Sequence, residues 1–349
     1  MRVYEIGDYN KGLGLHIVER PMPKPGHGEV VMKVRATGIN ARDLTIMHGG
    51  ATPDGKPTQP QTRVPLSDNA GDVAAIGPGV TRVAVGDRVT MTHYWQWLDG
   101  HWNASMTAKD YANNIDGFLA EYVVVPEAPL IKIPDSISYE EASTLQSAGL
   151  TAWNAVVEAG GAKAGDVVLT IGTGGVSVFG MQWAKMVGAT VIITSSSDEK
   201  LAVMRKMGAD ITINYRSSPD WAQEVLKKTG GRGADIVLNN VGPSETDSCL
   251  IAAASNGRVM HIGANPVSRD RKPVELKPLT RMGSLIIKDL TLKGIIVGSR
   301  RMFEDLLRAM AANNIKPLID KVFPFEQARD AVAYMESGDK LGKVLIRVQ

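Results

Sequence analysis

The segment GTGG at 172–175 has the clearest chemical meaning in this sequence because of what surrounds it. An unbroken apolar stretch at 167–171 precedes it, apolar residues at helical spacing follow at 176–187, and a second apolar run lies at 190–194. This order predicts a strand, a tight turn, a helix and a second strand, with helix N-terminal amides that bind a pyrophosphate. Ser177 replaces the third glycine of the usual dinucleotide pattern, so the alternative is a turn that serves packing only. The predicted pyrophosphate contacts are Gly172, Thr173, Gly174, Gly175 and Val176.

The residues after the second strand indicate which dinucleotide binds. NAD sites usually carry Asp or Glu about 20 residues after the glycines, whereas an NADP site needs hydroxyls and cations for the 2′-phosphate. This chain has a run of hydroxyls at 194–197, and then Lys200, with Tyr215 and Arg216 after the next strand. We therefore predict NADP(H) as the cofactor, with Ser196, Lys200, Tyr215 and Arg216 as phosphate contacts. The alternative for Lys200 and Arg216 is that they are solvated surface charges.

Apolar patterning predicts the scaffold that holds this turn. From residue 165 onward, apolar strand segments alternate with helical intervals, which is typical of a doubly wound parallel sheet of the Rossmann type, an α/β fold. The six expected strands lie at 167–171, 191–194, 211–214, 236–239, 259–262 and 290–297.

The first 125 residues have a different pattern, with short β-like segments separated by proline and glycine turns. This pattern predicts an all-β, barrel-like domain. Its expected strands lie at 2–6, 15–19, 29–36, 72–76, 88–91 and 120–125. Two long polar stretches, at 49–63 and 99–117, are of the kind that covers or lines a binding site.

A capping box at Ser138 and Glu141 predicts a helix that continues, with a break near Gly149, to Val157. After Gly298 the pattern predicts a helix at 301–312, a strand at 321–323, a helix at 325–335 and a strand at 344–348. We expect this tail to return to the first domain. The predicted domains are 1–149 for catalysis, 150–297 for NADP(H) binding and 298–349 for the C-terminal return.

Composition places the chain among ordinary globular proteins. Its 349 residues exceed a usual single core, 44% are hydrophobic and 22% charged, and the formal net charge is +2. Such a balance does not indicate the strongly basic surface that binds nucleic acid. The single cysteine, Cys249, excludes an intramolecular disulfide and a thiolate-rich zinc site. Neither a signal peptide nor a membrane-spanning run is present in the sequence, so we expect a cytoplasmic protein that does not contact the membrane.

On its motifs the chain resembles the medium-chain dehydrogenase/reductase superfamily along essentially its whole length. The motifs that carry the match are ATGIN at 36–40, the run from AG at 70–71 to GDRV at 86–89, AGLTAW at 148–153, GTGGVS at 172–177, INYR at 213–216 and GKV at 342–344. The resemblance implies a GroES-like β-barrel catalytic domain interrupted by a Rossmann domain. It also implies an active site in the cleft between them and a homodimer formed through the edge of the Rossmann sheet.

The sequence departs from the family pattern at the positions that bind metal in its zinc-dependent members. Zinc-dependent members carry Cys where Asn40 stands, a His-Glu pair where Ser67 and Asp68 stand, and a third ligand, often Cys, where Ser147 stands. Catalytic zinc needs three good ligands and an open position, and these residues are poor substitutes. The four-cysteine lobe that holds structural zinc is also absent. We therefore predict no metal, and the chain looks similar to the zinc-independent, quinone oxidoreductase-like branch.

Without zinc, another group must polarise the accepting oxygen or protonate the product. Asn40, Ser67, Ser147 and Tyr94 are the candidate donors, and Asp43 would orient its neighbours. Each has an alternative: Asn40 fits a turn, Asp43 fits a cap of a helix that begins near Leu44, and Tyr94 fits an aromatic cleft wall. For His93 and His101 we favour ordinary loop histidines over a metal site or proton relay.

Further cofactor contacts are predicted where strands end. The segments 239–241 and 263–265 lie where open α/β sheets bind ligands. The resemblance adds Thr151 beside the nicotinamide and a lysine of the C-terminal motif. The residues assigned in this way are Thr151, Asn240, Gly263, Asn265 and Lys343.

Three functions remain open at this point. The leading one is a zinc-independent, NADPH-dependent oxidoreductase that transfers hydride to a quinone, enone or other conjugated carbonyl compound. Such an acceptor needs less polarisation than a simple ketone, because its charge is delocalised as hydride arrives. The second is an alcohol dehydrogenase-like reductase of aldehydes and ketones. The third, from another class, is a non-catalytic NADPH-binding sensor.

Overall fold

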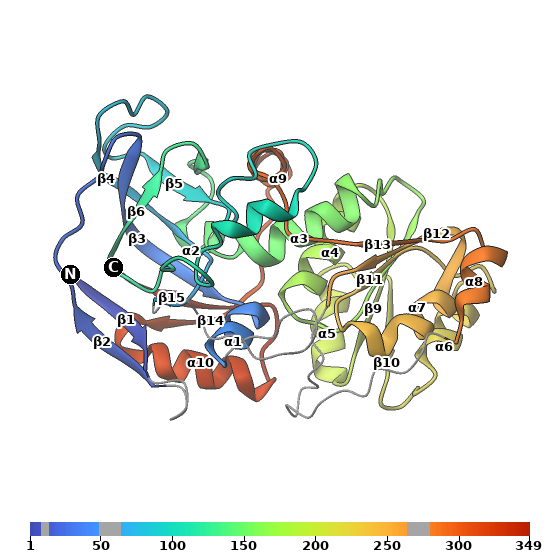
Figure 1. Cartoon of the computed structure of the whole chain (residues 1–349). Helices are drawn as coiled ribbons and strands as arrows, with labels where there is room; N and C mark the ends of the chain where they lie inside the picture. Colours follow the sequence, from blue (N-terminus) through green and yellow to red (C-terminus); the bar gives the residue numbers. More distant parts are fainter. Residues whose placement is uncertain (8–13, 49–63, 264–279) are drawn as a thin grey trace. The chain divides into compact units, whose positions relative to one another are not determined.

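A computed structural model describes residues 1–7, 14–48, 64–263 and 280–349. The chain forms two compact units (Figure 1). One, called here the β unit, combines Met1–Leu150 with Gly298–Gln349, and the other, the Rossmann unit, is Thr151–Val297. The expected polar loop at 49–63 and the predicted cofactor contact Asn265 lie outside the described residues.

The Rossmann unit contains a six-stranded parallel sheet in the order β10-β9-β8-β11-β12-β13. The strands are β8 (Val167–Thr170), β9 (Thr190–Ser195), β10 (Ile211–Asn214), β11 (Ala234–Asn239), β12 (Ala253–His261) and β13 (Thr291–Gly294). The predicted doubly wound α/β sheet is therefore confirmed. The main difference in its strands is that β12 begins at Ala253 rather than at 259.

Helices cover both faces of this sheet. They are α4 (Gly175–Met186), α5 (Asp198–Lys206), α6 (Trp221–Lys228), α7 (Thr246–Ala252) and α8 (Met282–Ile287). Leu169 and Val237 belong to one core with residues of α6 and α7. Leu238 points to the opposite face, because successive side chains of a strand alternate, and it lies against Gly180 of α4, where a Cβ would be 2.7 Å from its methyl group. Coverage on both faces explains the continuous apolar runs at 167–169 in β8, 191–193 in β9 and 236–238 in β11.

The β unit is organised around β3 (Glu29–Ile39), which extends beyond the predicted residue 36. One edge of β3 pairs with β4 (Ala70–Ile76), while β6 (Tyr122–Pro126) and β15 (Lys343–Arg347) pair with successive parts of β3. The seven-stranded sheet is completed by β5 (Arg88–Met91), β7 (Leu130–Lys132) and β14 (Ile319–Pro324), of which β7 had no clear sequence signal. A separate pair is formed by β1 (Arg2–Ile6) and β2 (Leu15–Glu19).

A single core joins the two ends of the chain within the β unit. Val30 and Met32 of β3 belong to the same buried cluster as Phe325 and Ile346 from the C-terminal segment. That segment contains α9 (Arg300–Ala312), a 3-10 turn at Phe325–Gln327, α10 (Ala328–Ser337) and β15. The antiparallel pairing of β15 with β3 places Val344 opposite Ile39. Lys343 is thereby brought beside the end of β3.

The helices near the unit boundary are shorter and less regular than the sequence predicts. The capping box at Ser138 and Glu141 is present and opens α2 (Tyr139–Ala142). The chain then forms π-helical turns at Leu145–Gly149 and Asn154–Glu158 on either side of α3 (Leu150–Trp153), in place of one long helix. Among the described helices, none combines the length and hydropathy needed to cross a bilayer.

Candidate active site

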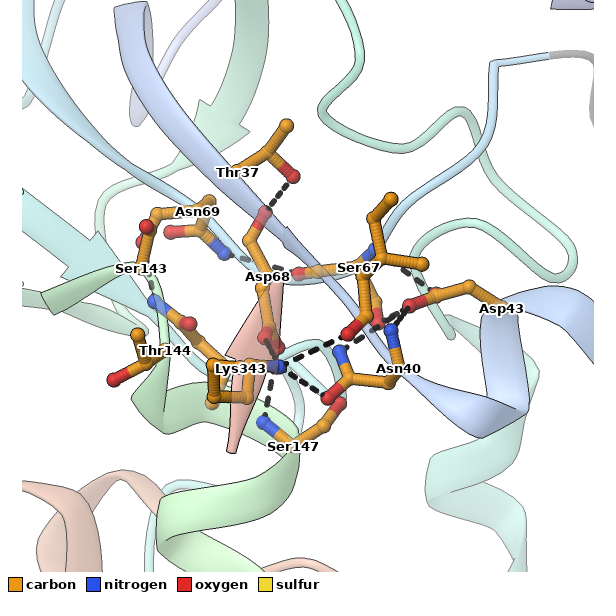
Figure 2. A network of polar contacts seen from close by, with 12 residues as sticks. Thr37, Asn40, Asp43, Ser67, Asp68, Asn69, Ser143, Thr144, Ser147 and Lys343 are labelled. Atoms are coloured by element: carbon orange, nitrogen blue, oxygen red, sulfur yellow. Dashed lines mark hydrogen bonds and ion pairs between the residues drawn. The ribbon is translucent and has the colours of Figure 1, made fainter. Parts of the chain in front are cut away.

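A buried polar cluster lies in the β unit at the end of β3 (Figure 2). We call its six residues the Lys343 network: Asn40, Asp43, Ser67, Asp68, Ser147 and Lys343. They come from four segments far apart in sequence, and none is more than 8% exposed. The structure thus brings together four of the five predicted catalytic residues and one predicted cofactor contact, Lys343.

The ammonium group of Lys343 lies at the centre of the network. Its Nζ donates to Asn40 Oδ1 at 2.5 Å, to Asp68 Oδ2 at 2.8 Å and to the carbonyl oxygen of Ile39 at 3.2 Å. An ammonium has three hydrogens to donate, so all three are used within the β unit. The sequence gives Lys343 a role as a cofactor contact, and that role stays a prediction.

Asp43 holds the other side of the network. Its Oδ2 accepts from the backbone and side-chain nitrogens of Asn40, and its Oδ1 accepts from the backbone nitrogen and hydroxyl of Ser67, at 2.8 to 3.2 Å. Burial raises the pKa of Asp43, and the nearby Arg42 opposes this shift. The prediction that Asp43 caps a helix beginning near Leu44 is wrong in register: α1 (Ala41–Met47) begins earlier, with Asn40 as N-cap and Asp43 three positions later in a capping box.

Asp68 was not among the predicted site residues, although it connects Lys343 with Ser147. One carboxylate oxygen accepts from Lys343 and the other accepts from the backbone nitrogen of Ser147 at 3.0 Å. The Asp68 carbonyl accepts from the Thr37 hydroxyl at 2.6 Å. Asp68 is therefore part of the candidate site. In the sequence, the feature that could have identified it was its position next to Ser67, which was a predicted site residue.

Two hydrogen-bond donors of the network remain available. Ser147 Oγ is buried and has no hydrogen-bond partner in the part of the chain that the structure describes. Asn40 Nδ2 has two hydrogens, of which Asp43 receives one. These two residues are also the most exposed of the network, at 7% and 8%. Because a buried unpaired hydroxyl is costly, Ser147 is a good candidate to bind a guest oxygen atom.

Tyr94 lies outside the network, among aromatic rings. Its ring contacts His93, with centroids 4.4 Å apart, and Trp102, with centroids 5.0 Å apart. Burial, and then the charge of Asp110, raise the pKa of Tyr94 to about 12, so it stays protonated at neutral pH. Asp110 pairs with Arg42 at 2.6 Å.

His93 differs from the loop histidine that the sequence favoured. It is fully buried, and neither ring nitrogen has a partner among the described residues. Burial, and then Arg42, lower the pKa of His93 well below its ordinary value. His101, by contrast, is exposed. Hydrophobicity patterns could not separate these two histidines, because both lie outside the helices and strands.

The residues of the Lys343 network do not fit a catalytic zinc. The described residues contain no group of three or more His, Cys, Asp or Glu side chains placed to hold a metal ion. Asn40 Oδ1 and Asp68 Oδ2 are already bonded to an ammonium, and the Ser67 hydroxyl donates to Asp43. Amide and hydroxyl oxygens are weak ligands for Zn²⁺, which prefers thiolate, imidazole and carboxylate groups.

The glycine turn of the Rossmann unit has the geometry that a dinucleotide site needs. Gly172 has φ +83°, a left-handed conformation that favours glycine, and its amide donates to Thr194 Oγ1 at 3.2 Å. Gly174 is the N-cap of α4, so the first amides of this helix have no intrahelical acceptor. Ser177, in place of the third glycine, donates to the Ile171 carbonyl at 2.7 Å and accepts from Asn240 Nδ2 at 2.7 Å. The serine thus ties the turn to the end of β11.

The other predicted cofactor residues follow the carboxyl ends of parallel strands, which share one edge of the sheet. Ser196 follows β9, Tyr215 follows β10, Asn240 follows β11 and Gly263 follows shortly after β12. Gly263 lies so close to the neighbouring loop that a Cβ would be 2.4 Å from the Asn240 carbonyl oxygen. Lys200 is partly buried in α5, and Arg216 is exposed. Thr151 and Thr173 are buried, at 6% and 7% exposure, and Val176 is partly buried; the cofactor contacts of all these residues stay predictions.

Comparison with known proteins identifies the family. The model of the alcohol dehydrogenase GroES-like domain matches residues 26–135, and that of zinc-binding dehydrogenases matches residues 175–312. A zinc-type alcohol dehydrogenase-like protein of Schizosaccharomyces pombe is 36% identical over 323 residues, which cover 92% of this chain and 91% of that protein. The chain belongs to the medium-chain, zinc-type alcohol dehydrogenase family. It is an NAD(P)-dependent oxidoreductase with a GroES-like domain and a Rossmann domain.

Other members of the family differ in cofactor and reaction. An acryloyl-coenzyme A reductase of Sulfurisphaera tokodaii is 27% identical over 96% of each chain. Among solved structures, an NAD-dependent alcohol dehydrogenase is 32% identical with a TM-score of 0.84, and a mycobacterial protein in complex with NADPH is 26% identical with a TM-score of 0.77, both over the full length of both chains. The superfamily resemblance is thus confirmed, whereas the quinone oxidoreductase-like branch is not supported by these relatives.

Proposed function

We propose that the protein reduces aldehydes or ketones with NADPH, and oxidises the corresponding alcohols in reverse, at the Lys343 network. The single observation that carries this proposal is the buried hydroxyl of Ser147, which has no hydrogen-bond partner among the described residues and belongs to the same polar cluster as Asn40. Ser147 Oγ has no partner among the described residues and Asn40 Nδ2 has a second hydrogen to donate, so both can bind an oxygen atom that gains negative charge. The names of the relatives, mostly alcohol and threonine dehydrogenases, support a carbonyl and alcohol pair over a quinone.

The residues of the network have separate tasks in this mechanism. Bound NADPH supplies the hydride. Ser147 Oγ and Asn40 Nδ2 hold the carbonyl oxygen and stabilise the charge that develops on it. The proton that completes the alcohol comes from solvent water, because Ser147 Oγ has no partner among the described residues that could replace a proton it gave up. Asp43 and Ser67 fix the orientation of Asn40 and of the loop at 67–68.

The preference for NADPH is the second part of the proposal. No acidic side chain ends β9, where NAD sites usually place one, and Ser195 and Ser196 stand there instead. Ser197 is occupied as the N-cap of α5, accepting from the backbone nitrogen of Lys200 at 3.2 Å, so Ser196 is the better phosphate contact. Lys200, Tyr215 and Arg216 complete the proposed site for the 2′-phosphate.

Product analysis tests the reaction. Purified protein is incubated with NADPH and an α,β-unsaturated ketone, and also with simple aldehydes and saturated ketones. The proposal predicts alcohols as products, with the C=C bond of the unsaturated ketone retained. A saturated ketone as the only product would overturn it.

Reduction of a conjugated C=C bond is the second candidate, and two observations favour it. The donor set of the network does not fit zinc, and the relative from Sulfurisphaera tokodaii is an acryloyl-coenzyme A reductase. A conjugated acceptor needs less polarisation, because its charge is delocalised as hydride arrives. The same product analysis separates the two candidates.

We also propose a homodimer formed through β13. This strand ends the described sheet, all of its residues are exposed, and the neighbouring α8 exposes Ile286 at 83% and Ile287 at 87%. An exposed strand edge beside apolar side chains is a favourable surface for pairing with a second copy. Analytical ultracentrifugation tests this: the double variant Ile286→Lys, Ile287→Lys should sediment as a monomer, and a monomeric native protein would contradict the proposal.

A further inference from the structure

His93 is a buried polar side chain that the proposed mechanism does not use. It is 0% exposed, and neither ring nitrogen has a hydrogen-bond partner among the described residues. A neutral imidazole has one N–H donor and one acceptor nitrogen, and leaving such groups unpaired in the interior costs free energy. A buried polar group in this condition is a candidate for contact with a bound molecule.

Hydrogen bonds place this histidine beside the Lys343 network. The Asn69 side chain accepts from the backbone nitrogen of Met91 at 3.0 Å and donates to the Met91 carbonyl oxygen at 3.1 Å. The same amide group of Asn69 also donates to the Ser67 carbonyl oxygen, at 3.2 Å. The end of β5 is thereby connected to the segment that carries Ser67. His93 follows Met91 by two residues, so it belongs to this border of the network.

The charges around His93 favour a neutral guest. Burial, and then Arg42, lower the pKa of His93, and Arg42 also opposes the rise that burial causes in the pKa of Asp43. Arg42 is therefore close to both side chains. Its Nη2 donates to the two carboxylate oxygens of Asp110, at 2.8 and 2.6 Å, and the pair as a whole carries no net charge. A hydroxyl suits the neutral imidazole, because it can donate to one ring nitrogen or accept from the other.

Aromatic rings form the surroundings of His93 on another side. The centroid of the Tyr94 ring lies 4.4 Å from that of His93, and Trp102 contacts Tyr94 and Trp97 with centroids 5.0 Å apart in each case. Such rings favour contact with an apolar or flat carbon skeleton. Tyr94 is itself partly exposed, so we expect a guest to reach the imidazole by moving Tyr94.

We propose that His93 selects substrates that carry a hydroxyl group in addition to the reacting carbonyl, through a hydrogen bond between that hydroxyl and the imidazole. Ser147 and Asn40 hold the carbonyl oxygen, and His93 holds the second oxygen of the same molecule. His93 is thus a specificity-determining residue. The identity of the reacting group rests on the proposed function, whereas binding of the hydroxyl is measurable without turnover.

Pairs of carbonyl compounds in which a methyl group replaces the hydroxyl test this selection. Suitable pairs are glycolaldehyde with propanal, hydroxyacetone with butanone, and para-hydroxybenzaldehyde with para-tolualdehyde, which place the hydroxyl at different distances from the carbonyl. In at least one pair, kcat/KM should be at least about tenfold higher for the hydroxyl compound. His93→Phe keeps a ring but removes both nitrogens, and should bring that ratio close to 1. No preference in the native enzyme, or an unchanged ratio in the variant, overturns the proposal.

Two further variants separate hydrogen bonding from a structural role. His93→Gln keeps a donor and an acceptor and should retain part of the preference for the hydroxyl compound, which filling of space alone would not explain. His101→Phe is the matched control, because His101 is exposed, and it should leave the ratio unchanged. Complete loss of the preference in His93→Gln, or an equal loss in His101→Phe, would contradict a hydrogen bond from His93.

A binding measurement distinguishes failure of this inference from failure of the proposed function. Protein with isotope-labelled histidine rings is studied by NMR with bound NADP⁺, and the His93 signals are identified by their absence in His93→Phe. Hydroxyl compounds of the three pairs should shift these signals, and their methyl counterparts should shift them much less. If no hydroxyl compound moves them, the inference fails even when carbonyl compounds are reduced. If they move but no carbonyl compound is reduced, the hydroxyl site is supported and the proposed reaction fails.

Discussion

The two units form their candidate sites in opposite ways. In the Rossmann unit the candidate site is formed by backbone groups. They are the amides at the start of α4, Gly172 with φ +83°, and Gly263, where no Cβ fits. In the β unit the candidate site is formed by six residues from four distant segments, and hydrogen bonds connect most of them to one another. A backbone site depends on local conformation, and a side-chain site depends on tertiary pairing. Substitutions should therefore affect the two units differently.

The largest expected effect is in the β unit, at the unpartnered hydroxyl. Ser147→Ala should reduce kcat by about 100- to 1,000-fold, as the loss of one oxyanion donor does in other enzymes. Stability should change little, since Ser147 Oγ has no internal partner among the described residues. Steady-state kinetics and thermal unfolding measure both.

Ser67→Ala is the matched control for this prediction. It also removes a buried hydroxyl, but one that donates to Asp43 at 3.0 Å. We expect it to cost about 1 to 3 kcal/mol of stability, because the buried Asp43 carboxylate loses one of its hydrogen bonds. If Ser147→Ala destabilised the protein as much and left kcat unchanged, the free donor would have no catalytic role.

In the Rossmann unit the largest effect should come from a substitution at Gly263, where two backbone segments lie very close together. In Gly263→Ala the new Cβ would lie within 2.6 Å of three backbone atoms of Asn240 and Val241, so the loop must move. We expect a loss of about 1 to 3 kcal/mol in unfolding free energy, and weaker NADPH binding. Gly283→Ala is the control: it lies in α8, where the new Cβ would meet no neighbouring atom of the described residues within 4 Å, and it should be neutral or stabilising by up to about 1 kcal/mol. Equal effects of the two would contradict the tight approach at Gly263.

Lys200→Ala sharpens the prediction of cofactor choice. A charge-assisted bond to the 2′-phosphate should be worth about 1.5 to 3 kcal/mol, so NADPH affinity should fall about 10- to 100-fold. NADH lacks that phosphate, and its affinity should change much less. Fluorescence titration with both cofactors provides the comparison, and equal losses would refute the assignment to NADP(H).

The smallest effect is a dependence of stability on pH that originates at His93. Burial lowers its pKa in the folded state, so below about pH 6.5 the unfolded chain takes up a proton that the folded protein does not. Stability should therefore fall as pH decreases from about 6.5, by up to about 1.4 kcal/mol per pH unit. His93→Phe should remove this slope between about pH 5 and 6.5 in urea unfolding experiments. An unchanged slope would show that His93 is not responsible.

A half-buried histidine gives the comparison for that experiment. His261 also has a lowered pKa, again mainly through burial, but the shift is opposed by a hydrogen bond with the backbone of Gly263. His261→Gln should remove a smaller part of the slope than His93→Phe does.

The comparison of the units also explains what the sequence could predict. The doubly wound sheet and the glycine turn were predictable, because apolar periodicity and glycine spacing are local signals that the Rossmann unit realises over a few residues. Asn40 and Ser147 could be chosen as candidates by their residue types and the resemblance. Their connection through Asp68 and Lys343 could not be predicted, since Asn40 and Lys343 are 303 positions apart and meet only when β15 pairs with β3. The register of α1 was missed because Asn40 and Asp43 are both good capping residues.

The pairing of β15 with β3 has a consequence for the newly made chain. On the ribosome, Asn40, Asp43 and Asp68 are synthesised long before Lys343, and the whole Rossmann unit is completed in between. During that interval the Asp68 carboxylate lacks its lysine counterion and must stay hydrated. The Lys343 network therefore cannot form until Lys343 has been synthesised, so we expect a nascent chain stalled before β15 to lack this network.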